Sequence, residues 1–167
     1  VVGVSGKQYV MNETVASNPK VEDVGYDSNL NYETLVMLRP DVVLMYGVTA
    51  ENSAVTAKLR DLDIPYLYLG DYTEESPLGK AEWLVAVAEI MGCRELGIER
   101  FTAIEHRYID TKNSVQCATS VPKVMFNLPY QDVWYMPSDD SYMVQLVEDA
   151  GGVYIYSGKN PTGGSKA

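Results

Sequence analysis

Five aromatic side chains occupy positions that could form a ligand site. Each follows a segment predicted to be a β-strand, or lies in the loop after one: Tyr26, Tyr46, Tyr130, Trp134 and Tyr135. In open parallel sheets, ligands bind outside the carboxyl ends of the strands. Aromatic rings with a few hydroxyls gathered there would form an apolar cleft suited to a large, flat or conjugated ligand. The alternative for each residue is that its ring only packs a loop onto the domain.

Catalytic and metal-binding patterns are weak in this sequence. The only histidine, His106, falls in the middle of a predicted helix, and no Ser–His–Asp or Cys–His arrangement is visible. An acidic loop with Asp71, Glu74 and Glu75 could hold paired carboxylates for acid–base chemistry or bind a hard cation. Alternatively, it is a solvated loop that favours the N-terminus of the next helix. We therefore predict no catalytic residue, no metal ligand and no resident cofactor.

The composition limits the class of protein. The 167 residues carry a net charge of −10, which disfavours a nucleic-acid or anionic-membrane surface, and 46% of them are hydrophobic, enough for a core. No apolar run in this sequence reaches the length needed to cross a bilayer, and its first residues do not show the pattern of a signal peptide. Cys93 and Cys117 flank a predicted helix of roughly 36 Å, so both are expected to be free thiols.

The stretch 21–47 must position two of the aromatic residues. It contains a short strand, a glycine turn, a helix and a second strand. Asn31 is expected to cap the helix, and Pro40 to end it by biasing Arg39 away from helical angles. The continuous apolar run at 41–46 is rich in β-branched residues and is typical of a strand that is covered on both faces.

The rest of the chain repeats this alternation. Further strands are predicted at 1–5, 64–69, 123–127 and 153–156, and helices at 52–62, 76–91, 95–119 and 141–150. Strands alternating with helices indicate parallel sheets, so the predicted fold class is α/β, with two parallel-sheet lobes bridged by one long helix. The predicted organisation is an N-terminal lobe at 1–92, an interlobe helix at 93–119 and a partial C-terminal lobe at 120–167.

These features resemble one protein family. The segments Val24-Gly25, Asn31-Tyr32-Glu33 and Leu38-Arg39-Pro40-Asp41-Val42-Val43-Leu44 are similar to the signature of the class III binding proteins of ABC importers, which carry iron-siderophores, haem or cobalamin. Ile64-Pro65 before a strand, the long helix, and Leu146 before Ala150-Gly151-Gly152 are also similar to the family pattern. The similarity covers nearly the whole chain, and its motifs identify the family better than the ligand.

The resemblance implies a ligand held between two α/β lobes that are joined by one helix. It implies that Glu33 docks to an arginine pocket of the membrane permease, although a carboxylate in the first turn of a helix is also favourable without docking. The ligand contacts that it implies are Tyr26, Asp27 and Tyr46 from the first lobe, and Tyr130, Trp134 and Tyr135 from the second.

The expected function is that of an extracytoplasmic solute-binding component of an ABC importer, in the periplasm or anchored to the membrane, without catalysis. Because family members have further elements before Val1 and after Ala167, the chain resembles a fragment cut at both ends. We expect such a fragment to homo-oligomerise through exposed sheet edges and apolar faces. Two alternatives remain: a metal- or cofactor-handling enzyme that uses the acidic loop, and a sensor domain that signals through a partner protein.

Overall fold

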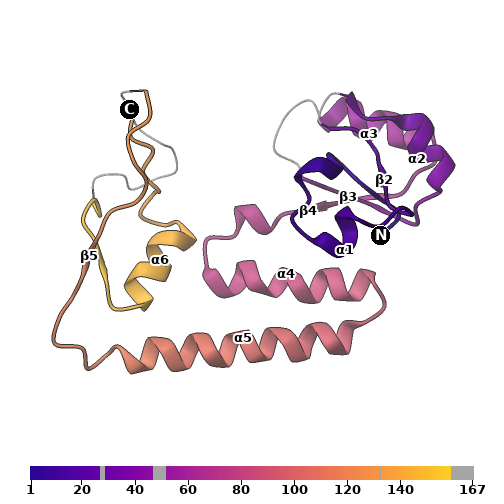
Figure 1. Cartoon of the computed structure of the whole chain (residues 1–167). Helices are drawn as coiled ribbons and strands as arrows, with labels where there is room; N and C mark the ends of the chain where they lie inside the picture. The colour runs from indigo at the N-terminus through magenta and orange to yellow at the C-terminus, as the bar shows by residue number, and fades with distance from the viewer. Residues whose placement is uncertain (27–28, 47–51, 132, 159–167) are drawn as a thin grey trace. The chain divides into compact units, whose positions relative to one another are not determined.

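The computed structural model of the chain describes residues 1–26, 29–46, 52–131 and 133–158. Contacts divide the chain into two units, Val1–Gly70 and Asp71–Ala167 (Figure 1). The sequence analysis assigned 71–92 to the N-terminal lobe, whereas the contacts group this segment with the second unit, because its helix packs along the helix that follows it. The boundaries of the two lobes stay a prediction.

The first unit contains two pairs of parallel strands. β1 (Gly3–Val4) pairs with β2 (Glu22–Asp23), and β3 (Val43–Tyr46) pairs with β4 (Tyr66–Leu69). Each of the four strands lies inside its predicted segment but is shorter than it. The short helices η1 (Lys7–Tyr9) and α1 (Glu13–Ala16) lie between β1 and β2.

Two further helices complete this unit. α2 (Tyr32–Leu38) begins after Asn31, whose side chain accepts a hydrogen bond from the Thr34 N–H at 3.0 Å, as the capping prediction requires. Arg39 adopts a left-handed conformation (φ 46°), so α2 ends before Pro40, as predicted. The other helix, α3 (Asn52–Asp61), precedes β4.

The core of the first unit lies on one face of the β3–β4 pair. Its buried residues come from both helices and from the strand ends: Val24, Leu35, Leu59 and Ile64. Val43, Met45 and Tyr66 pack against them from the sheet. The opposite face carries Leu44 and its parallel neighbour Leu67, which are both exposed. The prediction that this strand is covered on both faces is therefore wrong within this unit, because α2 and α3 pack on the same side.

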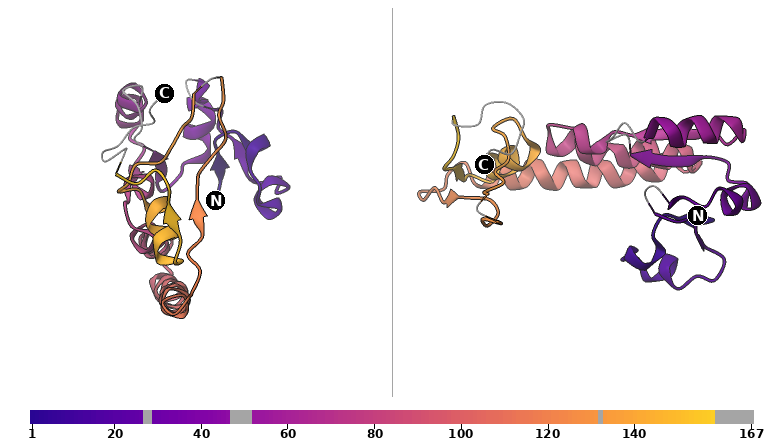
Figure 2. Two further views of the ribbon diagram at one scale, coloured as in Figure 1. Left: turned by 90° about the vertical axis from the view of Figure 1, so that its left-hand side faces the viewer. Right: turned by 90° about the horizontal axis from the view of Figure 1, so that it is seen from above.

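The second unit is built on two antiparallel helices. α4 (Pro77–Ile90) is capped by Ser76, which accepts a hydrogen bond from the Gly79 N–H at 3.0 Å, and α5 (Arg94–Ser114) lies beside it (Figure 1 and Figure 2). A Cβ at Gly97 would overlap Ala88, so glycine allows the two helices to approach closely. The long helix ends at Ser114 rather than near residue 119, since hydroxyls in its last turns bond back to backbone carbonyls and compete with helical geometry.

A small α/β segment completes the second unit. β5 (Lys123–Val124) pairs in parallel with β6 (Val153–Tyr154), and α6 (Tyr142–Asp149) connects them. The side chain of Ser141 caps α6 through the Val144 N–H at 3.4 Å. The buried residues of this segment are Met136, Val144 and Tyr154, against which Phe126 and Trp134 pack.

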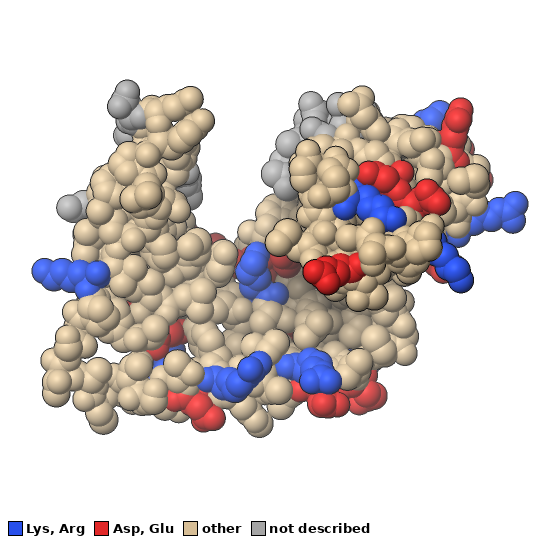
Figure 3. Space-filling view, viewed as in Figure 1, with Lys and Arg blue, Asp and Glu red and all other residues tan. Residues whose placement is uncertain are grey.

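The surface of the chain carries both signs of charge. On the face drawn in Figure 3, acidic and basic side chains are interspersed, and much of the face is uncharged. Acidic residues number 23 against 13 Lys and Arg in the whole sequence. Among the residues that the structure describes, no helix is both long enough and apolar enough to cross a membrane.

Candidate functional site

Tyr26 lies at the carboxyl end of the β1–β2 pair. Its side chain is 58% exposed, and its ring centroid lies 5.6 Å from that of Tyr9, with an angle of 59° between the ring planes. Tyr9 is the last residue of η1, the short helix that follows β1. Because the two strands run parallel, each delivers one tyrosine to the same end of this small sheet.

The backbone before Tyr26 adopts a conformation that requires glycine. Gly25 has a φ of 85°, and a Cβ there would overlap the carbonyl oxygen of Asn29. The Gly25 N–H donates a hydrogen bond to the Asp23 carboxylate at 2.9 Å. These features fix the direction in which the chain leaves β2 and presents Tyr26. The predicted contact Asp27 lies outside the described residues.

Tyr46 is the last residue of β3, and its side chain is 54% exposed. In the parallel register it pairs with Leu69, on the sheet face that also carries Leu44. Its ring thus lies at the carboxyl end of the β3–β4 pair and away from the core, where the ligand-site argument expects it. Its role in ligand binding stays a prediction.

The aromatic residues of the second unit differ in exposure. The Trp134 indole N–H donates a hydrogen bond to the Phe126 carbonyl at 2.9 Å, and its half-buried ring packs on the core of this unit. Tyr130 and Tyr135 are exposed. Trp134 therefore fits the alternative interpretation, in which a ring packs a loop onto the domain, while the two tyrosines present their rings to solvent.

The turn between these aromatic residues is held by backbone and side-chain hydrogen bonds. Tyr130 and Val133 exchange backbone hydrogen bonds of 2.8 and 3.0 Å. Asn127 adopts a left-handed conformation (φ 58°), which asparagine tolerates better than most residues, and its amide donates to the Tyr135 carbonyl at 2.6 Å. The positions of both exposed tyrosines are therefore set by local bonds rather than by burial.

Glu33 lies in the first turn of α2, two residues after the cap Asn31. Its side chain is exposed. The positive end of the helix favours a carboxylate at this place, and exposure leaves it accessible to another protein. Docking of Glu33 to a permease stays a prediction.

Two side chains of α4 hold the acidic loop that precedes this helix. The ammonium group of Lys80 contacts the Asp71 carboxylate at 3.4 Å and donates a hydrogen bond to the Asp71 carbonyl at 3.0 Å. The Trp83 indole N–H donates to Glu74 at 2.8 Å. No cluster of three or more His, Cys, Asp or Glu able to hold a metal ion occurs within the described part of the chain. The loop thus contributes to the local structure around α4.

The remaining candidate residues for chemistry are a histidine and two cysteines. His106 is exposed on α5, and Cys93 and Cys117 are exposed free cysteines.

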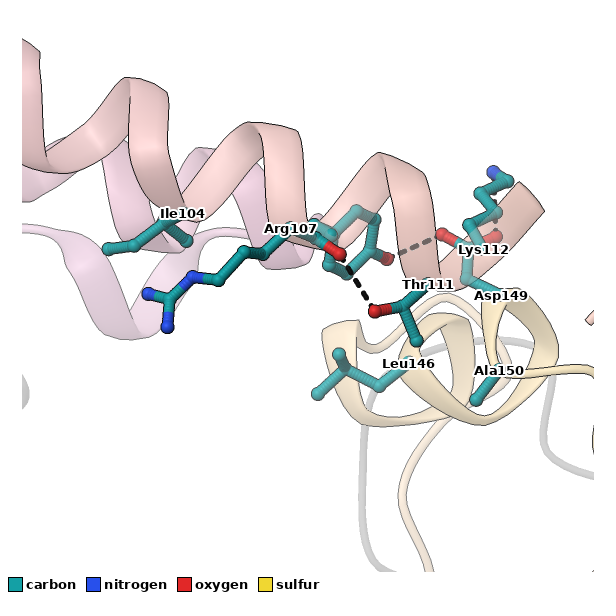
Figure 4. A pocket seen from close by; sticks show the side chains of 8 residues that line it. Ile104, Arg107, Thr111, Lys112, Leu146, Asp149 and Ala150 are labelled. Atoms are coloured by element: carbon teal, nitrogen blue, oxygen red, sulfur yellow. Dashed lines mark hydrogen bonds and ion pairs between the residues drawn. The ribbon is translucent and has the colours of Figure 1, made fainter. Parts of the chain in front are cut away.

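A hollow of about 320 Å³ lies between α5 and α6 (Figure 4). Ile104 and Leu146 supply apolar lining, and Arg107 extends along one side. At its end, the Tyr108 hydroxyl donates a hydrogen bond to Asp149 at 2.5 Å, and the Lys112 ammonium lies 2.8 Å from the same carboxylate. This network joins the long helix to the segment that follows it.

The network changes the titration of two of its members. Burial raises the pKa of the Tyr108 hydroxyl, and so does its hydrogen bond to the carboxylate of Asp149. Burial by itself would raise the pKa of Asp149, but the hydrogen bonds from Lys112 and Tyr108 and the charge of Lys112 outweigh it and lower this pKa. The carboxylate is therefore held ionised and the phenol neutral.

Tyr9 is the aromatic residue that the sequence analysis did not select. Its sequence signal is the same as that of Tyr26, since it also follows a strand, at 1–5. Three residues separate that predicted strand from Tyr9, so the relation is less direct than for Tyr26. The parallel pairing of β1 with β2 brings the two tyrosines together.

The chain was compared with known protein families and curated proteins. The family model described as "Periplasmic binding protein" matches residues 1–167. An uncharacterized lipoprotein of Methanocaldococcus jannaschii is 28% identical over 169 residues, which cover 98% of this chain and 40% of that protein. The chain thus spans well under half the length of this relative.

Solved structures share the fold. They include a periplasmic heme-binding protein, RhuT, from Roseiflexus sp. RS-1 (20% identity, TM-score 0.69, 100% of this chain and 62% of that one). The siderophore-binding protein FhuD from Vibrio cholerae, bound to Fe3+–Desferal, gives 22% identity and a TM-score of 0.64 over 92% of this chain and 59% of that one. The periplasmic vitamin B12 binding protein BtuF from Vibrio cholerae gives 17% identity and a TM-score of 0.62 over 99% of this chain and 61% of that one. The predicted fold class, two-lobe α/β, and the predicted family are confirmed.

Proposed function

The chain belongs to the periplasmic binding protein family, and from this we propose that it is the solute-binding component of an ABC importer and acts outside the cytoplasm. Members of this family and the structural neighbours bind solutes and are not enzymes. The relative from Methanocaldococcus jannaschii is named a lipoprotein, which supports a location in the periplasm or on a membrane anchor.

The proposed ligand is an iron-siderophore, haem or cobalamin. The observation that carries this proposal is the set of exposed aromatic rings that follow strands. Tyr26 and Tyr46 lie at the carboxyl ends of β2 and β3, and Tyr130 and Tyr135 lie in the loop after β5. Flat aromatic faces with a hydroxyl at one end suit conjugated ligands that also carry polar groups. Structural neighbours named for haem, siderophore and vitamin B12 binding support the same ligand class.

Direct titration tests the ligand class. The intact protein is titrated with haem, with the ferric Desferal complex and with vitamin B12, while tyrosine and tryptophan fluorescence is recorded. Binding at micromolar or lower concentration, about 8 kcal/mol or more, is expected for one of the three. Metal-free Desferal is the matched control for the siderophore. A protein that responds to none of the three would contradict the proposal.

The permease contact is tested separately through Glu33. We expect Glu33→Gln to leave ligand binding unchanged and to reduce uptake through the reconstituted permease, since only docking loses a charge. Glu13→Gln is the matched control, because Glu13 is also an exposed glutamate in the first turn of a helix with an asparagine cap. Equal uptake by both variants would exclude Glu33 as a docking residue.

A further inference from the structure

Asp23 connects two segments that are distant in the sequence. One oxygen of its carboxylate accepts hydrogen bonds from the Gly25 N–H at 2.9 Å and the Gly6 N–H at 3.2 Å, and the other accepts one from the Lys7 N–H at 3.0 Å. Gly6 and Lys7 lead from β1 into η1, and Gly25 leads from β2 to Tyr26. One side chain thus ties together the two turns that carry Tyr9 and Tyr26.

Gly6 leaves room for the rings of Tyr9 and Tyr26 because it has no side chain. Gly6 has a φ of 64°, and a Cβ there would lie 2.9 Å from a ring carbon of Tyr9 and 3.0 Å from one of Tyr26. Its N–H also donates to the Gly25 carbonyl at 3.0 Å. Both rings therefore pack over a bare backbone, and a side chain at this position would push them away.

A second set of hydrogen bonds holds the segment that leads into β2. The Lys7 ammonium donates hydrogen bonds to the carbonyls of Asn18 at 2.9 Å and Val21 at 2.6 Å. β1 and β2 contribute only two residues each to their sheet, so the ladder by itself holds these turns weakly. The hydrogen bonds of Lys7 and Asp23 supply the order that the short strands lack.

These hydrogen bonds fix the backbone that carries a solvent-exposed pair of aromatic rings. The Tyr9 side chain is 67% exposed, so the two rings bury little surface against each other. A network that fixes a solvent-exposed pair adds little to a hydrophobic core. It does remove, before binding, the backbone freedom of the two turns that would otherwise be lost on contact with a ligand.

We propose that Asp23 is a positioning residue that holds Tyr9 and Tyr26 as one preformed aromatic pair, and that this pair binds the face of a conjugated ring of the ligand. The proposal rests on the proposed solute-binding function. It adds Tyr9 to the ligand contacts and gives Asp23 a role that acts through the two tyrosines.

The test measures affinity for haem or vitamin B12, whichever the intact protein binds, because both carry a conjugated ring system. Binding of the ferric Desferal complex alone, which carries none, would overturn the inference. Tyr9→Leu and Tyr26→Leu remove a ring face and keep an apolar side chain, and each is expected to weaken binding about fivefold to tenfold. Tyr68→Leu is the matched control, since Tyr68 is an exposed tyrosine of the same unit that lies on β4 in an edge-to-face pair with Tyr66. We expect it to bind as the unsubstituted protein does.

Asp23→Asn tests the positioning role, because an amide nitrogen cannot accept the Lys7 N–H. We expect a loss of affinity similar to that of Tyr9→Leu. The control is Asp61→Asn, at an exposed aspartate that ends α3. In a double-mutant cycle, Asp23→Asn should cost little further affinity once both Tyr9 and Tyr26 are leucine. Additive losses would show that Asp23 does not act through the two tyrosines. Circular dichroism of each variant verifies that it is folded.

The outcomes separate this inference from the function on which it rests. If the unsubstituted protein binds none of the three probes, the proposed function and this inference both fail. If it binds one of them while Tyr9→Leu and Tyr26→Leu bind equally well, the inference alone is overturned. Weaker binding by both, with Tyr68→Leu unaffected and a non-additive cycle, supports it.

Discussion

The contact between α5 and α6 gives the sharpest stability prediction, Tyr108→Phe. This change removes one hydroxyl and leaves the ring in place. The hydroxyl donates to Asp149 at 2.5 Å, and the Asp149 side chain is only 14% exposed, so water replaces the lost donor poorly. We expect the free energy of unfolding of the second unit to fall.

The magnitude follows from the type of hydrogen bond. A bond to a charged group contributes about 1.5–3 kcal/mol. Lys112 still neutralises Asp149 in the variant, but its own side chain is about half exposed, which limits what the remaining ion pair contributes. We therefore expect a loss of about 2 kcal/mol for Tyr108→Phe and about 1 kcal/mol or less for Lys112→Met.

Urea unfolding followed by tryptophan fluorescence measures this change. Both tryptophans, Trp83 and Trp134, belong to the second unit, so the signal reports this unit alone. With an m-value of about 1–2 kcal/mol per molar urea, the midpoint should fall by about 1–2 M. The matched control is Tyr135→Phe at an exposed tyrosine, for which no shift is expected. If Tyr108→Phe unfolds at the same urea concentration as the unsubstituted protein, the hydrogen bond does not contribute as argued.

Three further predictions concern pH, the first core and association. Folding lowers the pKa of Asp149, so the contribution of this carboxylate to stability should begin to be lost as the pH falls below about 4. Folding raises the pKa of Tyr108, so the contribution of its hydroxyl should begin to be lost as the pH rises above about 10. Urea midpoints measured across this pH range check both expectations. Leu59→Ala should destabilise the first unit by about 2–5 kcal/mol in far-UV circular dichroism, whereas Leu67→Ala on the exposed sheet face should cost much less. The 167-residue chain alone should self-associate through exposed apolar faces, and light scattering that shows a monomer at high concentration would contradict this.

The sequence predicted the local structure where one side chain controls it. The predicted cap Asn31 is confirmed, and Ser76 and Ser141 cap their helices in the same way, because a cap accepts a hydrogen bond from a backbone amide within three residues. Alternating strands and helices gave the α/β class, and the Pro40-Asp41 segment, with the helix before it, pointed to the family. Each of these signals lies within a short stretch of chain.

Other features depend on contacts between distant residues. The sequence suggested Trp134 as a ligand contact or as a ring that packs a loop. The tertiary structure shows that this ring packs on a core and that its indole N–H donates to the Phe126 carbonyl. The hydrogen bond between Tyr108 and Asp149 has no local signal either, because the two residues lie 41 positions apart in the chain. No spacing rule connects such pairs.

The aromatic residues after the strands illustrate the division. The sequence by itself determined that tyrosines follow the strands of an α/β protein, because residue type and periodicity are local properties. Only the tertiary structure decided that Tyr9 and Tyr26 become a pair. The parallel pairing of β1 with β2 brings Asp23 to two backbone amides, 16 and 17 positions away in the chain, from which it accepts hydrogen bonds. A carboxylate specifies how many donors it can accept, and the fold specifies which donors reach it.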